Sequence, residues 1–97
     1  MAAYFIVDID IKDTDRMREY REAVPRTIQK YGGRYLVRAG RWEVVEGHWH
    51  PKRVVVLEFP SVEQAKRWYD SEDYRELKAQ RQAASSSNVI LVEGTRV

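Results

Sequence analysis

The segment Arg53–Arg81 constrains the fold more than any other part of the sequence. It begins with the apolar run Val54–Leu57, which is typical of a strand buried in a sheet. Pro60 ends this strand because proline has no N–H group to donate to a neighbouring strand. Ser61 and Gln64 then have the spacing of a capping box at the start of a helix. The sequence therefore predicts a buried strand followed directly by a helix.

Two helical pieces are predicted after this strand, and Ser71 separates them. In both pieces residues recur at spacings of three and four, which places them on one helical face. The first stripe is Val62, Ala65, Trp68 and Tyr69, and the second is Tyr74, Leu77, Lys78 and Arg81. The second stripe thus ends in an arginine on a face that otherwise has a buried pattern.

The N-terminal third is predicted to form a strand and a long helix. Tyr4–Ile11 alternates with the period of two that is typical of a sheet. Asp13 or Thr14 then caps a helix whose apolar stripe at helical spacing is Met17, Tyr20, Val24, Ile28 and Tyr31. Pro25 lies inside this helix and is expected to kink it or to split it in two, because proline cannot donate the backbone hydrogen bond. Gly32-Gly33 ends the helix.

The middle of the chain is predicted to form a hairpin. Arg34–Ala39 is a strand, and Gly40 is expected to bend it because glycine within a strand often marks a bulge. Trp42–Glu46 is expected to continue this strand. Gly47–Lys52 then forms the turn into the strand that begins at Arg53.

The last strand completes the predicted order. Ser85–Asn88 is expected to break the preceding helix, and Val89–Val92 to form a short strand that Gly94 ends. The order is then strand, helix, strand, strand, helix, strand, over a single domain of residues 1–97. This is the split βαβ, ferredoxin-like arrangement of the α+β class: a four-stranded antiparallel sheet with both helices on one face.

Alternation divides the strand residues into two predicted faces. The set assigned to the face beneath the helices is Phe5, Val7, Ile9, Ile11, Tyr35, Val37, Ala39, Val55, Leu57, Phe59, Ile90 and Val92. The set assigned to the uncovered face is Tyr4, Ile6, Asp8, Asp10, Arg34, Leu36, Arg38, Val54, Val56, Glu58, Val89, Leu91 and Glu93. The aliphatic residues of the second set form a larger apolar patch than a monomer usually exposes. We therefore expect a homodimer in which two copies bury this face against each other. The charged residues of this set either pair or hold a polar ligand within the interface, or lie in solvent at its rim.

Composition excludes several classes of protein. The 97 residues are 43% hydrophobic and 33% charged, with no apolar run long enough for a membrane span and no visible signal peptide. There is no cysteine, and the net charge of +2 is spread among interspersed acids and bases. We therefore expect a cytoplasmic protein that binds neither membranes nor nucleic acid.

Several motifs in order resemble the domain of unknown function 1330 family. They are YFIVDID from Tyr4, YGGRYLVR from Tyr31, Glu46-Gly47, RVVVLEFPS from Arg53, Trp68-Tyr69, Ser71, Tyr74, Arg81 and Glu93-Gly94. The resemblance covers almost the whole chain. It implies a dimeric α+β barrel of ferredoxin-like protomers, in a superfamily that includes cofactor-free monooxygenases, isomerases and decolorising peroxidases. It implies no assigned activity and no catalytic residues.

A ligand pocket is predicted between the second helical unit and the sheet. The candidate ligand-binding residues are Arg38, Trp68, Tyr69, Ser71, Tyr74 and Arg81. Aromatic walls with a cation suit a planar anionic ligand. The alternative is that the aromatic residues are core and that Arg81 bonds a carboxylate or a carbonyl at a helix end.

The residues Glu46, His48 and His50 alternate, so an extended ribbon would project all three to one side, as a zinc or iron site requires. Gly47 and Pro51 indicate a turn that breaks this alternation, so we expect no metal. We also expect no other cofactor.

Two hypotheses on function remain open, and the sequence does not decide whether the protein is an enzyme. The first is a small dimeric enzyme, or enzyme-like binder, of a small organic acid or aromatic ligand. The second is a non-catalytic dimeric module for ligand sensing or protein interaction, in which the same residues are core.

Overall fold

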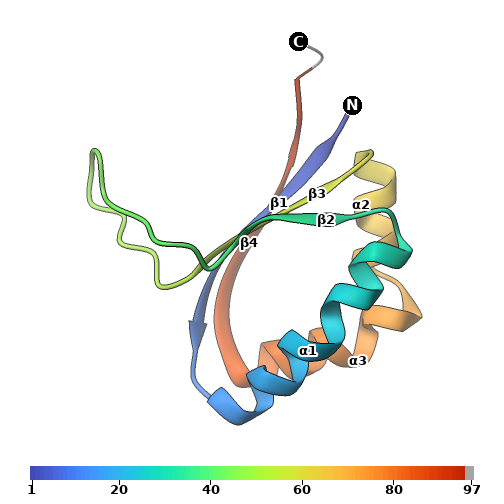
Figure 1. Ribbon diagram of the computed structural model, residues 1–97, viewed down its shortest axis with the longest axis horizontal. Coiled ribbons are helices and arrows are strands. Elements are labelled where there is room, and N and C mark those ends of the chain that lie inside the picture. Colours follow the sequence, from blue (N-terminus) through green and yellow to red (C-terminus); the bar gives the residue numbers. More distant parts are fainter. Residues whose placement is uncertain (96–97) are drawn as a thin grey trace.

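Three helices lie on one face of a four-stranded antiparallel sheet in the computed structural model (Figure 1). The structure describes residues 1–95, so the last two residues of the predicted domain lie outside the described part. The strands are β1 (Ala3–Ile11), β2 (Arg34–Arg38), β3 (Val54–Phe59) and β4 (Ser85–Glu93), in the order β2-β3-β1-β4. The helices are α1 (Thr14–Lys30), α2 (Val62–Tyr69) and α3 (Glu72–Ala84). The predicted α+β, ferredoxin-like order is confirmed, with the second helical unit divided at Ser71.

Polar side chains begin all three helices. The caps are Asp13, Ser61 and Ser71, which accept hydrogen bonds from the backbone N–H groups of Arg16, Gln64 and Tyr74 at 3.2, 3.1 and 3.1 Å. Each cap satisfies one of the backbone donors that a helix leaves free at its start. Helix α1 runs through Pro25 without splitting, and Gly32 follows it at a φ of +82°, where a side chain would be strained. No helix within residues 1–95 has the length and apolar character that a membrane span needs.

The predicted faces of β1 and β3 are confirmed. Phe5 pairs with Leu57, and both lie in the core beneath the helices. Phe59 lies in the same core and is fully buried. A Cβ atom added at Gly33 would lie 2.6 Å from the Phe59 ring, so only glycine fits there without movement.

A β-bulge between Tyr35 and Val37 reverses the two faces at the end of β2. The pairs that fix this register are Tyr35 with Leu57, Val37 with Val56, and Arg38 with Val55. Val37 therefore lies on the uncovered face and Arg38 on the helix side, the opposite of the predicted assignment. The prediction was wrong because it placed the irregularity at Gly40, after the residues that it affects.

Strand β4 also differs from the prediction, both in length and in face. It begins at Ser85 instead of Val89, and its pairing with β1 is Phe5 with Leu91, Ile6 with Ile90, and Val7 with Val89. Val89 and Leu91 consequently pack against the core, whereas Ile90 and Val92 are 57% and 39% exposed. The assignment was wrong because Val89–Val92 are all apolar. Without alternating polar residues, the sequence does not show which of these side chains face the core.

Residues 39–53 form a long connection between β2 and β3, called the arm below. It projects from the sheet on the side away from the helices (Figure 1). The strand expected at Trp42–Glu46 is absent from it, since β2 ends at Arg38. The base of the arm is held by Asp8, whose carboxylate accepts hydrogen bonds from Trp49 Nε1 at 3.3 Å and from the backbone N–H of Lys52 at 2.9 Å.

Candidate ligand-binding site

A cavity of about 500 Å³ lies between the sheet and the helices. This volume is within the range of small-molecule sites. Five of the six predicted site residues line it: Arg38, Trp68, Tyr69, Tyr74 and Arg81. Much of the remaining wall is apolar and comes from β1, β3 and β4, including Phe5, Val7, Val55, Leu57 and Val89. The structure thus brings most of the predicted set together around one space.

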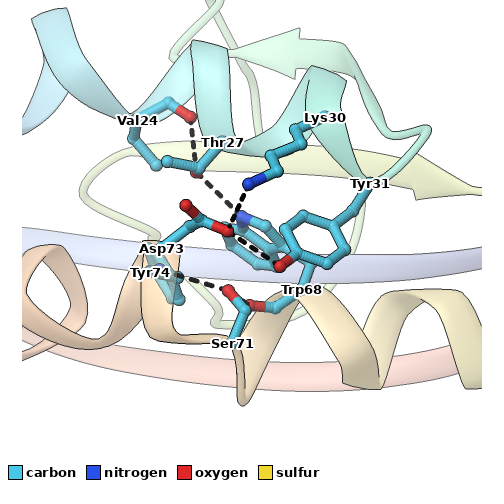
Figure 2. Close-up of polar contacts among 8 residues, drawn as sticks. All are labelled: Val24, Thr27, Lys30, Tyr31, Trp68, Ser71, Asp73 and Tyr74. Atoms are coloured by element: carbon cyan, nitrogen blue, oxygen red, sulfur yellow. Dashed lines mark hydrogen bonds and ion pairs between the residues drawn. The ribbon is translucent and has the colours of Figure 1, made fainter.

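Trp68 forms a rigid part of the cavity wall. Its ring stacks on Tyr74 with centroids 4.1 Å apart and contacts Phe59 at 5.4 Å. Its Nε1–H donates to Thr27 Oγ1 at 2.9 Å, and that hydroxyl donates to the Val24 carbonyl at 2.8 Å (Figure 2). Because both faces and the polar edge are engaged, the ring has a fixed orientation.

Ser71, the sixth predicted site residue, lies outside the cavity lining. Its hydroxyl caps α3 and donates to the Trp68 carbonyl at 2.7 Å, so it joins α2 to α3 (Figure 2). Asp73 in the next turn accepts hydrogen bonds from Lys30 Nζ at 2.9 Å and from the Tyr31 hydroxyl at 2.8 Å. The hydrogen bonds from Lys30 and then Tyr31 lower the pKa of Asp73. These contacts hold α1 against α3 beside the cavity.

Arg81 is a buried cation with no carboxylate partner within residues 1–95. It is 5% exposed, and its Nε–H donates to the Tyr74 hydroxyl at 3.3 Å. The ion pairs of the described chain lie elsewhere, on more exposed side chains. A guanidinium keeps its charge at any pH at which proteins fold, and a buried charge without a counter-charge costs several kcal/mol. The cavity is therefore electrostatically suited to an anion.

Tyr20 is a polar residue of the site that the sequence analysis included only in the apolar stripe of α1. Its hydroxyl lies 2.7 Å from that of Tyr74, and both rings are buried. Burial raises the pKa of Tyr20 and of Tyr74 above the ordinary value of a phenol, so both are protonated at neutral pH. The two residues are 54 positions apart, and no sequence spacing could have paired them.

Arg38 reaches the helix side of the sheet because of the bulge in β2. Its guanidinium lies 4.6 Å from the centroid of the Tyr35 ring, and its Nη2 donates to the Arg21 carbonyl at 2.7 Å. The side chain is exposed, in contrast to Arg81. Arg38 thus adds to the lining a cation in a more solvated place than Arg81, and Arg18, Arg21 and Arg53 line the cavity as well.

A second hollow of about 410 Å³ adjoins the first near the junction of α3 and β4. The residues Tyr69, Arg81 and Val89 line both. Ser85 and Ser87 add hydroxyl groups to the second hollow. Arg81 therefore lies between an apolar space and a more polar one.

The weak metal candidates Glu46, His48 and His50 lie in the arm. His50 Nδ1 is 3.0 Å from the carbonyl oxygen of His48, and bends interrupt the extended ribbon that the alternation would need. Within residues 1–95, no group of three or more His, Cys, Asp or Glu side chains is arranged to hold a metal ion.

Comparisons with known proteins identify the fold more closely than the chemistry. A family model described as Domain of unknown function (DUF1330) matches residues 2–95. None of the curated proteins matches the chain.

Solved structures with the same fold share little sequence with this chain. The RPA0582 protein of unknown function from Rhodopseudomonas palustris has a TM-score of 0.79 at 17% identity, covering 99% of this chain and 84% of that one. SnoaB, a cofactor-independent oxygenase from Streptomyces nogalater, has a TM-score of 0.67 at 9% identity, with coverages of 99% and 95%. A putative antibiotic biosynthesis monooxygenase from Nitrosomonas europaea has a TM-score of 0.55 at 13% identity, with coverages of 97% and 91%.

Proposed function

The chain belongs to the DUF1330 family of domains of unknown function, and we propose that it is a dimeric enzyme or enzyme-like binder of a small organic ligand. The ligand is an organic acid or an aromatic compound, and it occupies the cavity between the sheet and the helices. The observation that carries this proposal is Arg81, a buried cation without a carboxylate partner in the described chain, on the wall of a 500 Å³ cavity. The fold shared with a cofactor-independent oxygenase agrees with a ligand cavity but supplies no substrate.

A thermal-shift screen of carboxylates and phenols tests the cavity. A ligand that binds the folded state stabilises it and so raises Tm. The gain in the free energy of unfolding is about 2.7 kcal/mol at a ligand concentration 100 times its Kd. We expect hits with the wild type, and we expect Arg81→Met to lose the charged ones. Arg75→Met is the matched control, because Arg75 lies on the exposed side of the same helix and pairs with Glu72. A screen without any hit would contradict the proposal.

The uncovered face of the sheet supports the homodimer. The aliphatic side chains on this face, called the open face below, are Ile6, Val37, Val54, Val56, Ile90 and Val92. The arm projects to the same side, and its Trp42, Val45 and Trp49 are 43%, 92% and 63% exposed. A second copy placed on the open face buries the patch, and the arm then lies at its edge.

An enzyme changes its bound ligand chemically, whereas a simple binding protein releases it unchanged. The only carboxylate lining the cavity within residues 1–95 belongs to Glu22, and the buried phenols keep their protons. This lining favours the binding module as the second candidate, since it offers few groups for proton transfer. Mass spectrometry of a ligand recovered after incubation with protein in air decides the matter: an altered ligand indicates an enzyme, and an unchanged one a binder.

A further inference from the structure

The polar end of the cavity is a chain of three side chains from two helices. Tyr20 comes from α1, and Tyr74 and Arg81 come from α3, two helical turns apart. Arg81 Nε–H donates to Tyr74, and the Tyr74 and Tyr20 hydroxyls lie 2.7 Å apart. All three are at most 8% exposed, and all three line the cavity.

These three side chains together have more hydrogen-bond donors than acceptors. The two hydroxyls share a single hydrogen bond, so one of their two protons is used and the other is not. The terminal amino groups of Arg81 make no hydrogen bond to another residue of the described chain. No buried side-chain nitrogen or oxygen within residues 1–95 lacks a partner altogether, so these amino groups have access to open space.

The unused donors identify the kind of group that would complete the site. A hydroxyl proton and the Arg81 amino protons are both offered where no protein acceptor is available. Such donors bind a charged oxygen better than a neutral one, because hydrogen bonds to ionised groups are about twice as strong. Beside them, side chains of the strands such as Val7 and Leu57 give the cavity an apolar wall.

We propose that Tyr20, Tyr74 and Arg81 bind the carboxylate of an aromatic acid, whose ring lies against the apolar side chains of the strands. This inference rests on the proposed function, and it adds the ligand class and a role for Tyr20. Arg81 supplies the charge, Tyr74 positions its guanidinium, and the hydroxyl pair adds one neutral donor.

Isothermal titration of the full chain with 2-naphthoate and with its uncharged amide, 2-naphthamide, tests the inference. We expect the carboxylate to bind at least about tenfold more tightly than the amide, as hydrogen bonds to a charged group imply. Tyr20→Phe removes one oxygen and should weaken 2-naphthoate binding about tenfold, while changing 2-naphthamide binding less than threefold. Tyr31→Phe is the control, because the Tyr31 hydroxyl bonds Asp73 on the outside of the helices.

The outcomes distinguish this inference from the proposed function. Equal binding of the two naphthalene compounds, with no effect of Tyr20→Phe, would overturn the carboxylate site and leave a ligand cavity. No binding of either compound, together with a thermal-shift screen without hits, would overturn both. Circular dichroism of each variant confirms that a lost affinity is not a lost fold.

Discussion

The two faces of the sheet are unusual in opposite ways: the covered face buries charged and polar groups, and the open face exposes apolar ones. The face beneath the helices encloses a cavity with a buried cation, Arg81, and a pair of buried hydroxyls. The open face instead presents aliphatic side chains such as Val56 and Ile90. A charge inside and an apolar patch outside are each unfavourable in an isolated monomer. The comparison teaches that the two proposals answer different imbalances: a bound anion would offset the charge on one side, and a second copy would cover the patch on the other.

The largest effect is expected from a charge on the open face. Val56→Glu would bury a carboxylate at the centre of the proposed interface in both copies, and one unpaired buried charge costs about 3–5 kcal/mol. We expect the dimer to weaken by at least about 100-fold, measured by light scattering or sedimentation at micromolar concentration. Gln29→Glu, on the exposed surface of α1, adds the same charge away from the sheet and should leave the dimer intact. A monomeric wild type would remove the basis of the comparison.

The covered face is tested by Gly33→Ala. The new methyl group would meet the Phe59 ring at 2.6 Å and Ile28 Cγ2 at 2.8 Å, so the core must shift. Overpacking of this kind costs about 1–3 kcal/mol, measured by chemical denaturation. Gly40→Ala is the matched control, because a Cβ atom there has no neighbour within 4 Å. Equal stability of the two variants would show that the core near Phe59 is loosely packed.

Alkaline pH tests the buried hydroxyls. Burial raises the pKa of Tyr20 in the folded state above the 10.0 of an exposed phenol. The unfolded chain therefore releases this proton first, so stability is complete below about pH 10 and falls as pH rises further. The loss is at most about 1.4 kcal/mol per pH unit for each phenol. We expect Tyr20→Phe to flatten the alkaline limb of the stability curve, measured by urea denaturation between pH 9 and 11.5. An unchanged limb would mean that the hydroxyl reaches solvent.

The smallest effect is expected at the exposed carboxylate that joins α1 to α3. Lys30 and Tyr31 lower the pKa of Asp73 below its usual 3.8. The contribution of Asp73 to stability is therefore present above this value and is lost as pH falls below it. Asp73→Asn should lower Tm slightly at pH 7 and have a smaller effect as the pH falls below 3.8. A larger loss than that of Gly33→Ala would show that this surface contact matters more than the core.

The sequence predicted the parts of the fold that local rules determine. The cap at Ser61 was visible because Ser61 and Gln64 have the spacing of a capping box. The sequence predicted the faces of β1 because β1 alternates unambiguously, and those of β3 because Pro60 fixes the end of that strand. Tyr74 and Arg81 were identified together because a spacing of seven places both on one helical face.

The remaining features depend on pairing between distant segments. Strand β4 was assigned to the wrong face because its phase comes from its register with β1 and not from its own composition. Tyr20 had the pattern of an ordinary core residue, and only the packing of α1 on α3 gives it a polar partner. Arg38 was predicted to line the cavity, but alternation placed its side chain on the other face of the sheet. No residue in β2 indicates a bulge at Leu36, so the sequence did not predict the change of face.

The extra residue in β2 has an evolutionary consequence. Because alternation has a period of two, a relative in which the residue equivalent to Leu36 pairs directly with that equivalent to Val56, without a bulge, would exchange the surroundings of the positions equivalent to Val37 and Arg38 without any substitution. The cavity would lose a cation in that single change of register, and the open face would gain one. Loss or gain of the bulge in this short strand would thus change both faces of the sheet at once.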